Sequence, residues 1–229
     1  MNIAEYHKIT TQLPATVRLV AVSKTKPKED IQVLYDEGQR VFGENKALEM
    51  KDKYENLPKD IEWHFIGHLQ SNKIKYIAPF VSLIHSIDSY ELLKEVNKYA
   101  VKNQRVLDCL IQFHIATEES KFGFNISECE AMLNDADFGN LTHINSRGVM
   151  GMASFTDDKE QVRKEFAQLQ NYFRLLKDKY FNTKSDFTEI SMGMSEDYPI
   201  AIEEGSTLIR VGSAIFGARN YAVKNNSNA

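Results

Sequence analysis

The sequence predicts an α/β fold, a single (β/α)8 TIM barrel, from the order, the number and the spacing of its segments. Short β-rich runs alternate with longer helical patterns along the whole chain of 229 residues. Such alternation is typical of a parallel sheet covered by helices. The β-rich runs lie at residues 18–23, 40–45, 61–67, 81–88, 105–115, 144–153, 187–193 and 207–213. Eight strand–helix units in this length fit one barrel with nothing appended.

The helical segments between the runs carry boundary signals. Segment 27–38 has Pro27 near its start and Gly38 at its end, which are residues that favour helix starts and stops. Segments 89–103 and 157–181 have apolar residues at helical spacing. The apolar residues on one face of the first of these two are Leu92, Leu93, Val96 and Tyr99.

An open, doubly wound sheet is the alternative fold. It has fewer strands, and its dinucleotide-binding form carries GxGxxG after the first strand, a motif that this chain lacks. No low-complexity linker interrupts the pattern, so we expect one domain over residues 1–222. The polar end, residues 223–229, is expected to be a disordered tail.

Composition excludes several classes of protein. Twenty-eight basic and thirty-two acidic residues give a net charge of −4, the wrong sign for a general nucleic-acid binder. No apolar run approaches the roughly 18 residues of a membrane span, and the first ten residues lack the apolar core of a signal peptide. Cys109 and Cys129 show no CxxC spacing and are expected to be reduced. A cytoplasmic protein without nucleic-acid or membrane partners is the expectation.

Two strand ends predict a phosphate site. In such a barrel the functional residues gather where the strands end. SMGMS at 191–195 and VGSA at 211–214 both join a strand to a helix through small residues. Small residues let backbone N–H groups approach an anion, and the following helix adds its dipole. One such turn alone would be an ordinary tight βα turn, but two on neighbouring strands favour phosphate.

Lys24 stands where the first apolar run ends, at the mouth of the expected barrel. Partial desolvation and the cationic neighbours Lys26 and Lys28 are expected to lower its pKa. The free amine that results attacks aldehydes to form a Schiff base. The alternative is a surface lysine whose amine reaches solvent. A lysine aldimine opposite a phosphate cradle is the minimum description of a pyridoxal 5′-phosphate site.

Arg210 is the other unusual charge. It lies between apolar neighbours in TLIRVGS and shares the parity of Leu208, so it needs a partner if it is buried. A structural ion pair with Glu189 or another strand-end carboxylate is the alternative to a cofactor contact.

Several motifs together resemble the pyridoxal phosphate homeostasis proteins, single-barrel relatives of the alanine racemase N-terminal domain (fold type III). The motifs are VSKTKP, VFGEN, HFIGHLQSNK, IHSID, GVMGMA and SMGMSEDYPIAIEEGSTLIRVGSAIFG, and they span residues 18–219.

The resemblance implies a role for six residues of the chain. Lys24 matches the aldimine lysine, Asn45 matches the asparagine beside the cofactor, and Arg210 matches the arginine facing the pyridine nitrogen. The residues that match the phosphate-binding groups are Ser191, Gly212 and Ser213. The family often has threonine in place of this last serine, which keeps the hydroxyl. His68 receives no role.

The resemblance also implies intracellular homeostasis of the cofactor rather than efficient catalysis, and it assigns no catalytic residue. An arginine at the pyridine nitrogen disfavours its protonation and makes the ring a weak electron sink. Alanine racemase adds a second base from a β domain, for which this chain, ending at Ala229, leaves no room. Apo-enzymes that use the cofactor are the expected partners, and a monomer is expected.

Three other functions stay open on the sequence. The first is a weak pyridoxal-phosphate-dependent racemase or lyase with Lys24 as its base. The second is a metal-dependent hydrolase, since His64 and His68 are four residues apart, although EWHFIGH reads as a strand and no HxH or HExxH occurs. The third, a protein-interaction module, leaves the strand-end residues unexplained.

Overall fold

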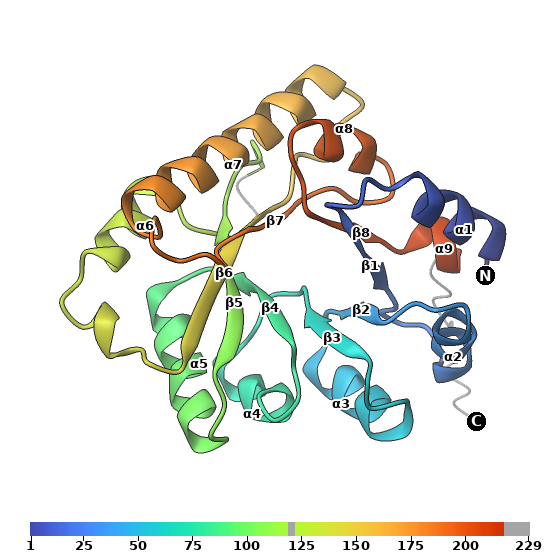
Figure 1. The fold of residues 1–229 in the computed structure, drawn as a ribbon, viewed down its shortest axis with the longest axis horizontal. Helices are drawn as coiled ribbons and strands as arrows, with labels where there is room; N and C mark the ends of the chain where they lie inside the picture. Colours follow the sequence, from blue (N-terminus) through green and yellow to red (C-terminus); the bar gives the residue numbers. More distant parts are fainter. Residues whose placement is uncertain (119–121, 218–229) are drawn as a thin grey trace, which may run out of the picture.

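A computed structural model of the chain describes residues 1–118 and 122–217, in which eight parallel strands close into a barrel (Figure 1). The strands are β1 (Arg18–Val22), β2 (Val41–Glu44), β3 (Glu62–Phe65), β4 (Leu83–Ile87), β5 (Leu107–Phe113), β6 (Ile144–Gly151), β7 (Glu189–Ser191) and β8 (Leu208–Val211). Neighbours in sequence are neighbours in the barrel, and β8 pairs with β1 to close it. The predicted barrel is confirmed, because a closed sheet excludes the open alternative, and every strand falls inside its predicted range.

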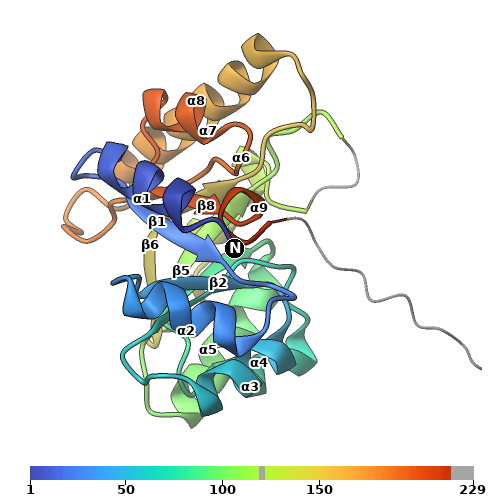
Figure 2. The same cartoon turned by 90° about the vertical axis from the view of Figure 1, so that its right-hand side faces the viewer.

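Helices cover the outside of the barrel (Figures 1 and 2). They are α1 (Ile3–Gln12), α2 (Lys28–Asp36), α3 (Ala47–Asn56), α4 (Ile74–Ile77), α5 (Tyr90–Lys102), α6 (Ile126–Leu133), α7 (Lys159–Lys179), α8 (Tyr198–Glu203) and α9 (Ser213–Phe216), with 3-10 turns at Ser71–Lys73 and Phe138–Asn140. The three predicted helices correspond to α2, α5 and α7. No described helix is long and apolar enough to cross a membrane. The expected tail at 223–229 lies outside the described residues.

Local signals set the helix boundaries. The Ser89 hydroxyl caps α5 by accepting the N–H of Leu92, at 3.3 Å. The predicted apolar face of α5 packs on the barrel, with Leu92, Leu93 and Val96 buried. The sequence reading missed α1, whose N-cap Asn2 accepts the N–H of Glu5 at 3.0 Å.

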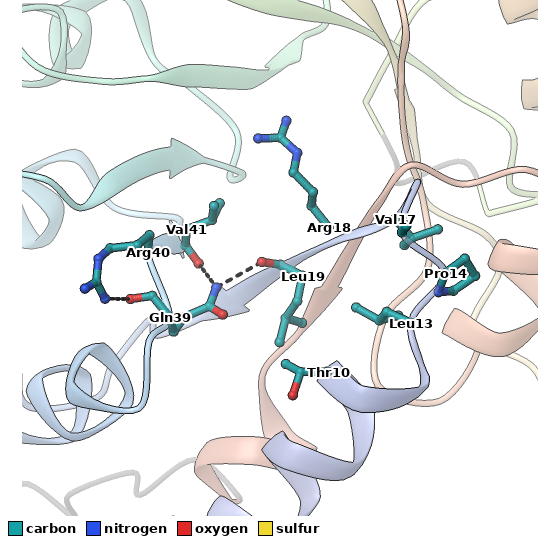
Figure 3. Close-up of a pocket in the computed structure, with 10 residues that line it drawn as sticks. Thr10, Leu13, Pro14, Val17, Arg18, Leu19, Gln39, Arg40 and Val41 are labelled. Atoms are coloured by element: carbon teal, nitrogen blue, oxygen red, sulfur yellow. Dashed lines mark hydrogen bonds between the residues drawn. The ribbon is translucent and has the colours of Figure 1, made fainter.

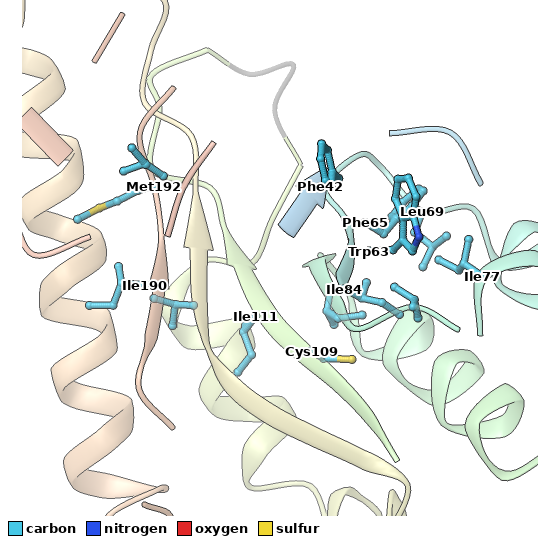
Figure 4. Close-up of a cluster of buried hydrophobic side chains, with 14 of the residues drawn as sticks. Phe42, Trp63, Phe65, Leu69, Ile77, Ile84, Cys109, Ile111, Ile190 and Met192 are labelled. Atoms are coloured by element: carbon cyan, nitrogen blue, oxygen red, sulfur yellow. The ribbon is translucent and has the colours of Figure 1, made fainter. Parts of the chain in front are cut away.

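Apolar residues form two cores, one on each face of the sheet. The outer core lies between strands and helices and includes Phe42, Trp63 and Phe65 (Figure 4). The inner core fills the barrel interior with the side chains of Val20, Val41, Leu83, Leu110, Met150 and Leu208. Side chains alternate between the two faces along each strand.

The inner core gives way to polar side chains toward the carboxyl ends of the strands. Two residues after Leu83 comes His85, and two after Leu208 comes Arg210, each on the same face of its strand. His85 and Arg210 are both buried. A polar layer therefore lies directly above the apolar filling, at the end of the barrel where active sites form.

Candidate functional site

Lys24 lies in a turn just beyond β1, which ends at Val22 and not at Lys24 as the sequence reading had it. Its side chain is half-buried. The other two lysines of the stretch are engaged elsewhere. Lys26 Nζ donates to the Phe216 carbonyl at the end of α9, at 3.0 Å, and Lys28 Nζ pairs with Asp52 of α3, at 3.0 Å. Of the three lysines, Lys24 lies nearest the end of β1 and therefore at the mouth of the barrel.

Asn45 follows β2 and lies beside the end of β3. A Cβ on Gly67 would lie 2.6 Å from the Asn45 carbonyl oxygen, so only glycine allows this close approach. Asn45 Oδ1 is buried and accepts no hydrogen bond from any residue that the structure describes. A buried amide oxygen without a donor is costly, and a ligand hydroxyl would satisfy it.

Arg210 points into the barrel interior and is 4% exposed. Its Nη1 donates to Ser191 Oγ at 2.6 Å and its Nη2 to the Gly151 carbonyl at 3.1 Å. The ion pair with Glu189 that was weighed for it does not form, because that carboxylate pairs with Arg18 at 3.0 Å. In the described part of the chain no ion pair links Arg210 to a carboxylate.

Burial lowers the pKa of Arg210 to about 10, against the opposing field of Asp197. The guanidinium therefore keeps its proton at neutral pH and can only donate hydrogen bonds. A buried cation with neutral partners is a costly arrangement that an acceptor on a ligand would relieve.

The β8–α9 turn brings together small polar groups. The Gly212 N–H donates to Ser195 Oγ at 3.4 Å, and Ser213 begins α9. A Cβ on Gly212 would lie 3.0 Å from the Val22 carbonyl oxygen, so this turn lies against the end of β1. Val22 precedes Lys24 by two residues, so the predicted phosphate cradle lies against the strand that leads into Lys24.

Ser191 lies deeper in the barrel than the other predicted phosphate ligands. Its Cα aligns with Leu208, four residues before Gly212 on β8. Its buried hydroxyl contacts Arg210 and also His85 Nδ1, at 2.8 Å. Ser191 therefore contacts Arg210 directly, while Ser195, the second serine of SMGMS, lies at the Gly212 turn.

A chain of buried histidines continues from Ser191 into the interior. His85 Nε2 lies 2.9 Å from His64 Nδ1, and both rings are buried. Burial, helped by the charge of Arg18, lowers the pKa of His64 to about 3. Burial also lowers the pKa of His85 well below its ordinary value, with His64 and Arg210 adding to the effect. Both rings are neutral at pH 7, so the chain can orient Arg210 without adding charge.

Comparisons with known proteins identify the family of the chain. The family model described as alanine racemase, N-terminal domain, matches residues 2–220. The pyridoxal phosphate homeostasis protein of Haemophilus influenzae is 39% identical over 92% of this chain and 89% of its own length. That of Escherichia coli K12 is 38% identical, over 92% of this chain and 89% of its own length.

The chain belongs to the family of pyridoxal phosphate homeostasis proteins. Among solved structures, PipY of Synechococcus elongatus with PLP bound is similar, with a TM-score of 0.84 and 32% identity over 95% of this chain and 100% of that chain. Alanine racemase from Bartonella henselae has a TM-score of 0.69 at 14% identity, over 95% of this chain and 58% of that chain, and shares the fold.

A pocket of about 340 Å³ lies at the opposite end of the barrel, where β1 and β2 begin (Figure 3). Gln39 Nε2 donates there to the carbonyls of Leu19 at 3.0 Å and Val41 at 2.6 Å. The arginines at its rim, Arg18 and Arg40, are paired with carboxylates. This pocket is remote from the strand ends that carry the family's motifs.

His64 and His68, the two histidines considered as metal ligands, have different surroundings. His64 is buried against His85, whereas His68 Nδ1 lies 2.9 Å from an oxygen of Asp88 and its ring stacks on Phe122, with centroids 4.2 Å apart. Within residues 1–118 and 122–217, no group of three or more His, Cys, Asp or Glu could hold a metal ion.

The histidine chain predicts a specific loss of stability in acid. The folded pKa of His64 is depressed to about 3, so the ring binds a proton in the unfolded chain below about pH 6.5 but not in the fold. Stability is therefore present above pH 6.5 and lost as the pH falls toward 3. His64→Gln should reduce the slope of unfolding free energy against pH, between pH 6 and 4, by about 1.4 kcal/mol per pH unit.

Urea unfolding at a series of pH values measures this slope, and groups common to both proteins cancel in the comparison. Val96→Ala, which removes buried apolar atoms of α5 and no titratable group, is the control: it should lower stability at every pH and keep the slope of the unsubstituted protein. Equal slopes for His64→Gln and the unsubstituted protein would contradict the assignment of a buried neutral ring.

Proposed function

We propose that the chain binds pyridoxal 5′-phosphate at the carboxyl ends of its strands and acts in the intracellular homeostasis of this cofactor. The observation that carries the proposal is the close approach of the Gly212 turn to Val22, two residues before Lys24, where β1 pairs with β8. The names of the relatives and the PipY structure with PLP bound support it.

The residues present fit this cofactor. Asn45 Oδ1 lacks a donor among the described residues, and Arg210 is a buried cation with neutral partners. An aromatic ligand with a hydroxyl and a ring nitrogen would supply both missing groups. Ser195, Gly212 and Ser213 offer hydroxyl and N–H donors to a phosphate.

Lys24 is the proposed covalent anchor. Its ε-amine condenses with the aldehyde, so that a C=N bond forms and one water leaves. When bound, the cofactor supplies an electron-withdrawing ring conjugated to this bond. The role of Arg210 is to donate a hydrogen bond to the ring nitrogen, and that of Ser191 is to orient Arg210 through its 2.6 Å contact.

The same arginine argues for storage or delivery rather than efficient catalysis. A cofactor ring accepts carbanion charge well only when its nitrogen is protonated. Arg210 keeps its own proton, since its pKa remains about 10 in the buried site. It therefore hydrogen-bonds the nitrogen without protonating it. The proposed partners are apo-enzymes that use the cofactor, with the chain acting as a cytoplasmic monomer.

Borohydride reduction followed by peptide mass mapping tests the proposal. The loaded protein should carry a pyridoxyl group on Lys24, and Lys24→Ala should lose the visible absorbance of the loaded protein. The barrel should stay folded, because Lys24 lies in the turn beyond β1 and outside both cores. Lys46→Ala, at an exposed lysine next to Asn45, is the control and should keep both signals. A pyridoxyl group on Lys26, on Lys46 or on no lysine would refute the anchor.

The cradle is tested by the phosphate itself. Pyridoxal without phosphate should bind at least about 100-fold more weakly, because each lost charge-assisted hydrogen bond is worth about 1.5–3 kcal/mol. Ser195→Ala should weaken binding of the phosphorylated form about tenfold and leave pyridoxal unaffected. Equilibrium titration of both ligands measures this. Comparable affinities for the two ligands would mean that the glycine turns bind no phosphate.

The rival racemase or lyase function is tested by turnover. With an unprotonated ring nitrogen, amino acids should shift the absorbance of the loaded protein slowly, without sustained product formation. Chiral chromatography after incubation with D- and L-amino acids measures racemisation, and keto-acid release measures the lyase. Steady-state turnover above roughly 1 s⁻¹, the low end of ordinary enzymes, would make the enzyme function the better one.

A further inference from the structure

Lys53 of α3 is a buried lysine, 3% exposed, directly behind the Lys24 turn. Its ammonium group donates to the Ser23 carbonyl at 2.9 Å, to Glu44 Oε1 at 2.7 Å and to Glu49 Oε1 at 2.7 Å. An ammonium has three donors, and here all three are used. Lysines are almost never buried unless paired, so this arrangement is a fixed structural element of the site.

The cluster of Glu44, Glu49 and Lys53 forms hydrogen bonds to the residues on both sides of Lys24. On one side, Ser23 donates its hydroxyl to Glu44 Oε1 at 2.6 Å and gives its carbonyl to Lys53. On the other side, the Thr25 N–H donates to Glu49 Oε1 at 2.6 Å. The two neighbours of Lys24 are thus bonded to one buried group of charges.

The turn needs such a grip because Thr25 has a left-handed backbone, with φ of 65°. β-branched residues rarely adopt this conformation. The carboxylate of Glu49 holds the Thr25 N–H in it, and Lys53 holds that carboxylate. Loss of either bond would leave the turn closed by the Lys26 N–H, which donates to the Ser23 carbonyl at 3.0 Å. We expect Thr25 then to leave the left-handed region and the adjacent Lys24 side chain to change direction.

Stability alone does not account for the cluster. Burial raises the pKa of Glu44 to about 7, and outweighs the opposing effect of Lys53 and Ser23. Glu44 Oε2 is buried and has no hydrogen-bond partner within the described residues. Apolar side chains of similar volume would fill such a space at no cost in stability in many proteins. A buried ion cluster is weak evidence for stability, so the contacts of the cluster with Ser23 and Thr25 are the observation that points to positioning.

We propose that Lys53, acting through Glu44 and Glu49, is a positioning residue that holds the Lys24 turn in the shape required for covalent capture of the aldehyde. The inference rests on the function proposed above, since it concerns the anchor of that same site. Lys53 itself does not touch the cofactor in this proposal. Its effect on affinity is confined to ligands with an aldehyde, which can form a covalent bond with Lys24.

Two ligands separate positioning from general damage. Pyridoxal 5′-phosphate has the aldehyde, whereas pyridoxine 5′-phosphate has an alcohol in its place and cannot bond Lys24. Lys53→Met should weaken binding of the aldehyde about tenfold or more, the effect of one lost hydrogen bond to a charged group. Binding of the alcohol should stay within about twofold. Lys51→Met, at an exposed lysine of the same helix paired with Glu55, is the matched control and should change neither affinity.

Glu49→Ala tests the same idea without removing a buried charge pair, because Lys53 keeps Glu44 and the Glu49 side chain is partly exposed. It should weaken aldehyde binding selectively, and Glu49→Gln, which keeps an acceptor for the Thr25 N–H, should restore most of it. Thr25→Gly should also rescue Lys53→Met in part, because glycine adopts positive φ without strain. A crystal structure of cofactor-free Glu49→Ala should show Thr25 outside the left-handed region.

The outcomes are distinguishable. If the unsubstituted protein captures no aldehyde on Lys24, the proposed function fails. If it does, and both Lys53→Met and Glu49→Ala capture it with unchanged affinity, the positioning role is overturned. Equal losses for aldehyde and alcohol would also overturn it, since they would assign the cluster a purely structural role.

Discussion

The pairing of β8 with β1 is the contact on which the site depends. It aligns Val20 with Arg210 and Ala21 with Val211, so that the two strands end side by side. Residues almost two hundred positions apart in the chain thereby meet, since Gly212 lies against Val22, two residues before Lys24. An open sheet would leave these strands at different places, and neither turn would make a site alone.

Closure of the sheet also determines which side chains fill the barrel interior. The lower part of the barrel is filled by apolar side chains such as Val20 and Leu208, and water is excluded from it. The polar layer above rests on that filling. Because Ser191 and His85 are neutral, they can support Arg210 without adding a second buried charge. Arg210 thus remains the only buried charge among these three residues.

Most of the fold could be predicted, because the alternation of strands with helices and the number of strands can both be read from the order of residues along the chain. Strand-end positions led to Lys24 and the Gly212 turn as predicted site residues, and their cofactor contacts stay a prediction. The sequence does not show that Ser191 contacts Arg210 while Ser195 accepts the Gly212 N–H, because both serines lie in SMGMS and their contacts depend on the strand register. The histidine chain was readable in principle, since His85 shares the parity of Leu83. Lys53 was not, because its position on α3 gives no sign that it reaches Ser23.

Lys53 and Arg210 are both buried cations near the carboxyl ends of the strands, but they differ in their partners. The difference bears on function. Lys53 has three acceptors, the Ser23 carbonyl and the carboxylates of Glu44 and Glu49. Arg210, equally buried, has a hydroxyl and a carbonyl and no ion pair with a described carboxylate. Lys53 is therefore compensated by carboxylates inside the protein, whereas the described partners of Arg210 are neutral. This difference is why the proposed function assigns the ligand contact to Arg210 and not to Lys53.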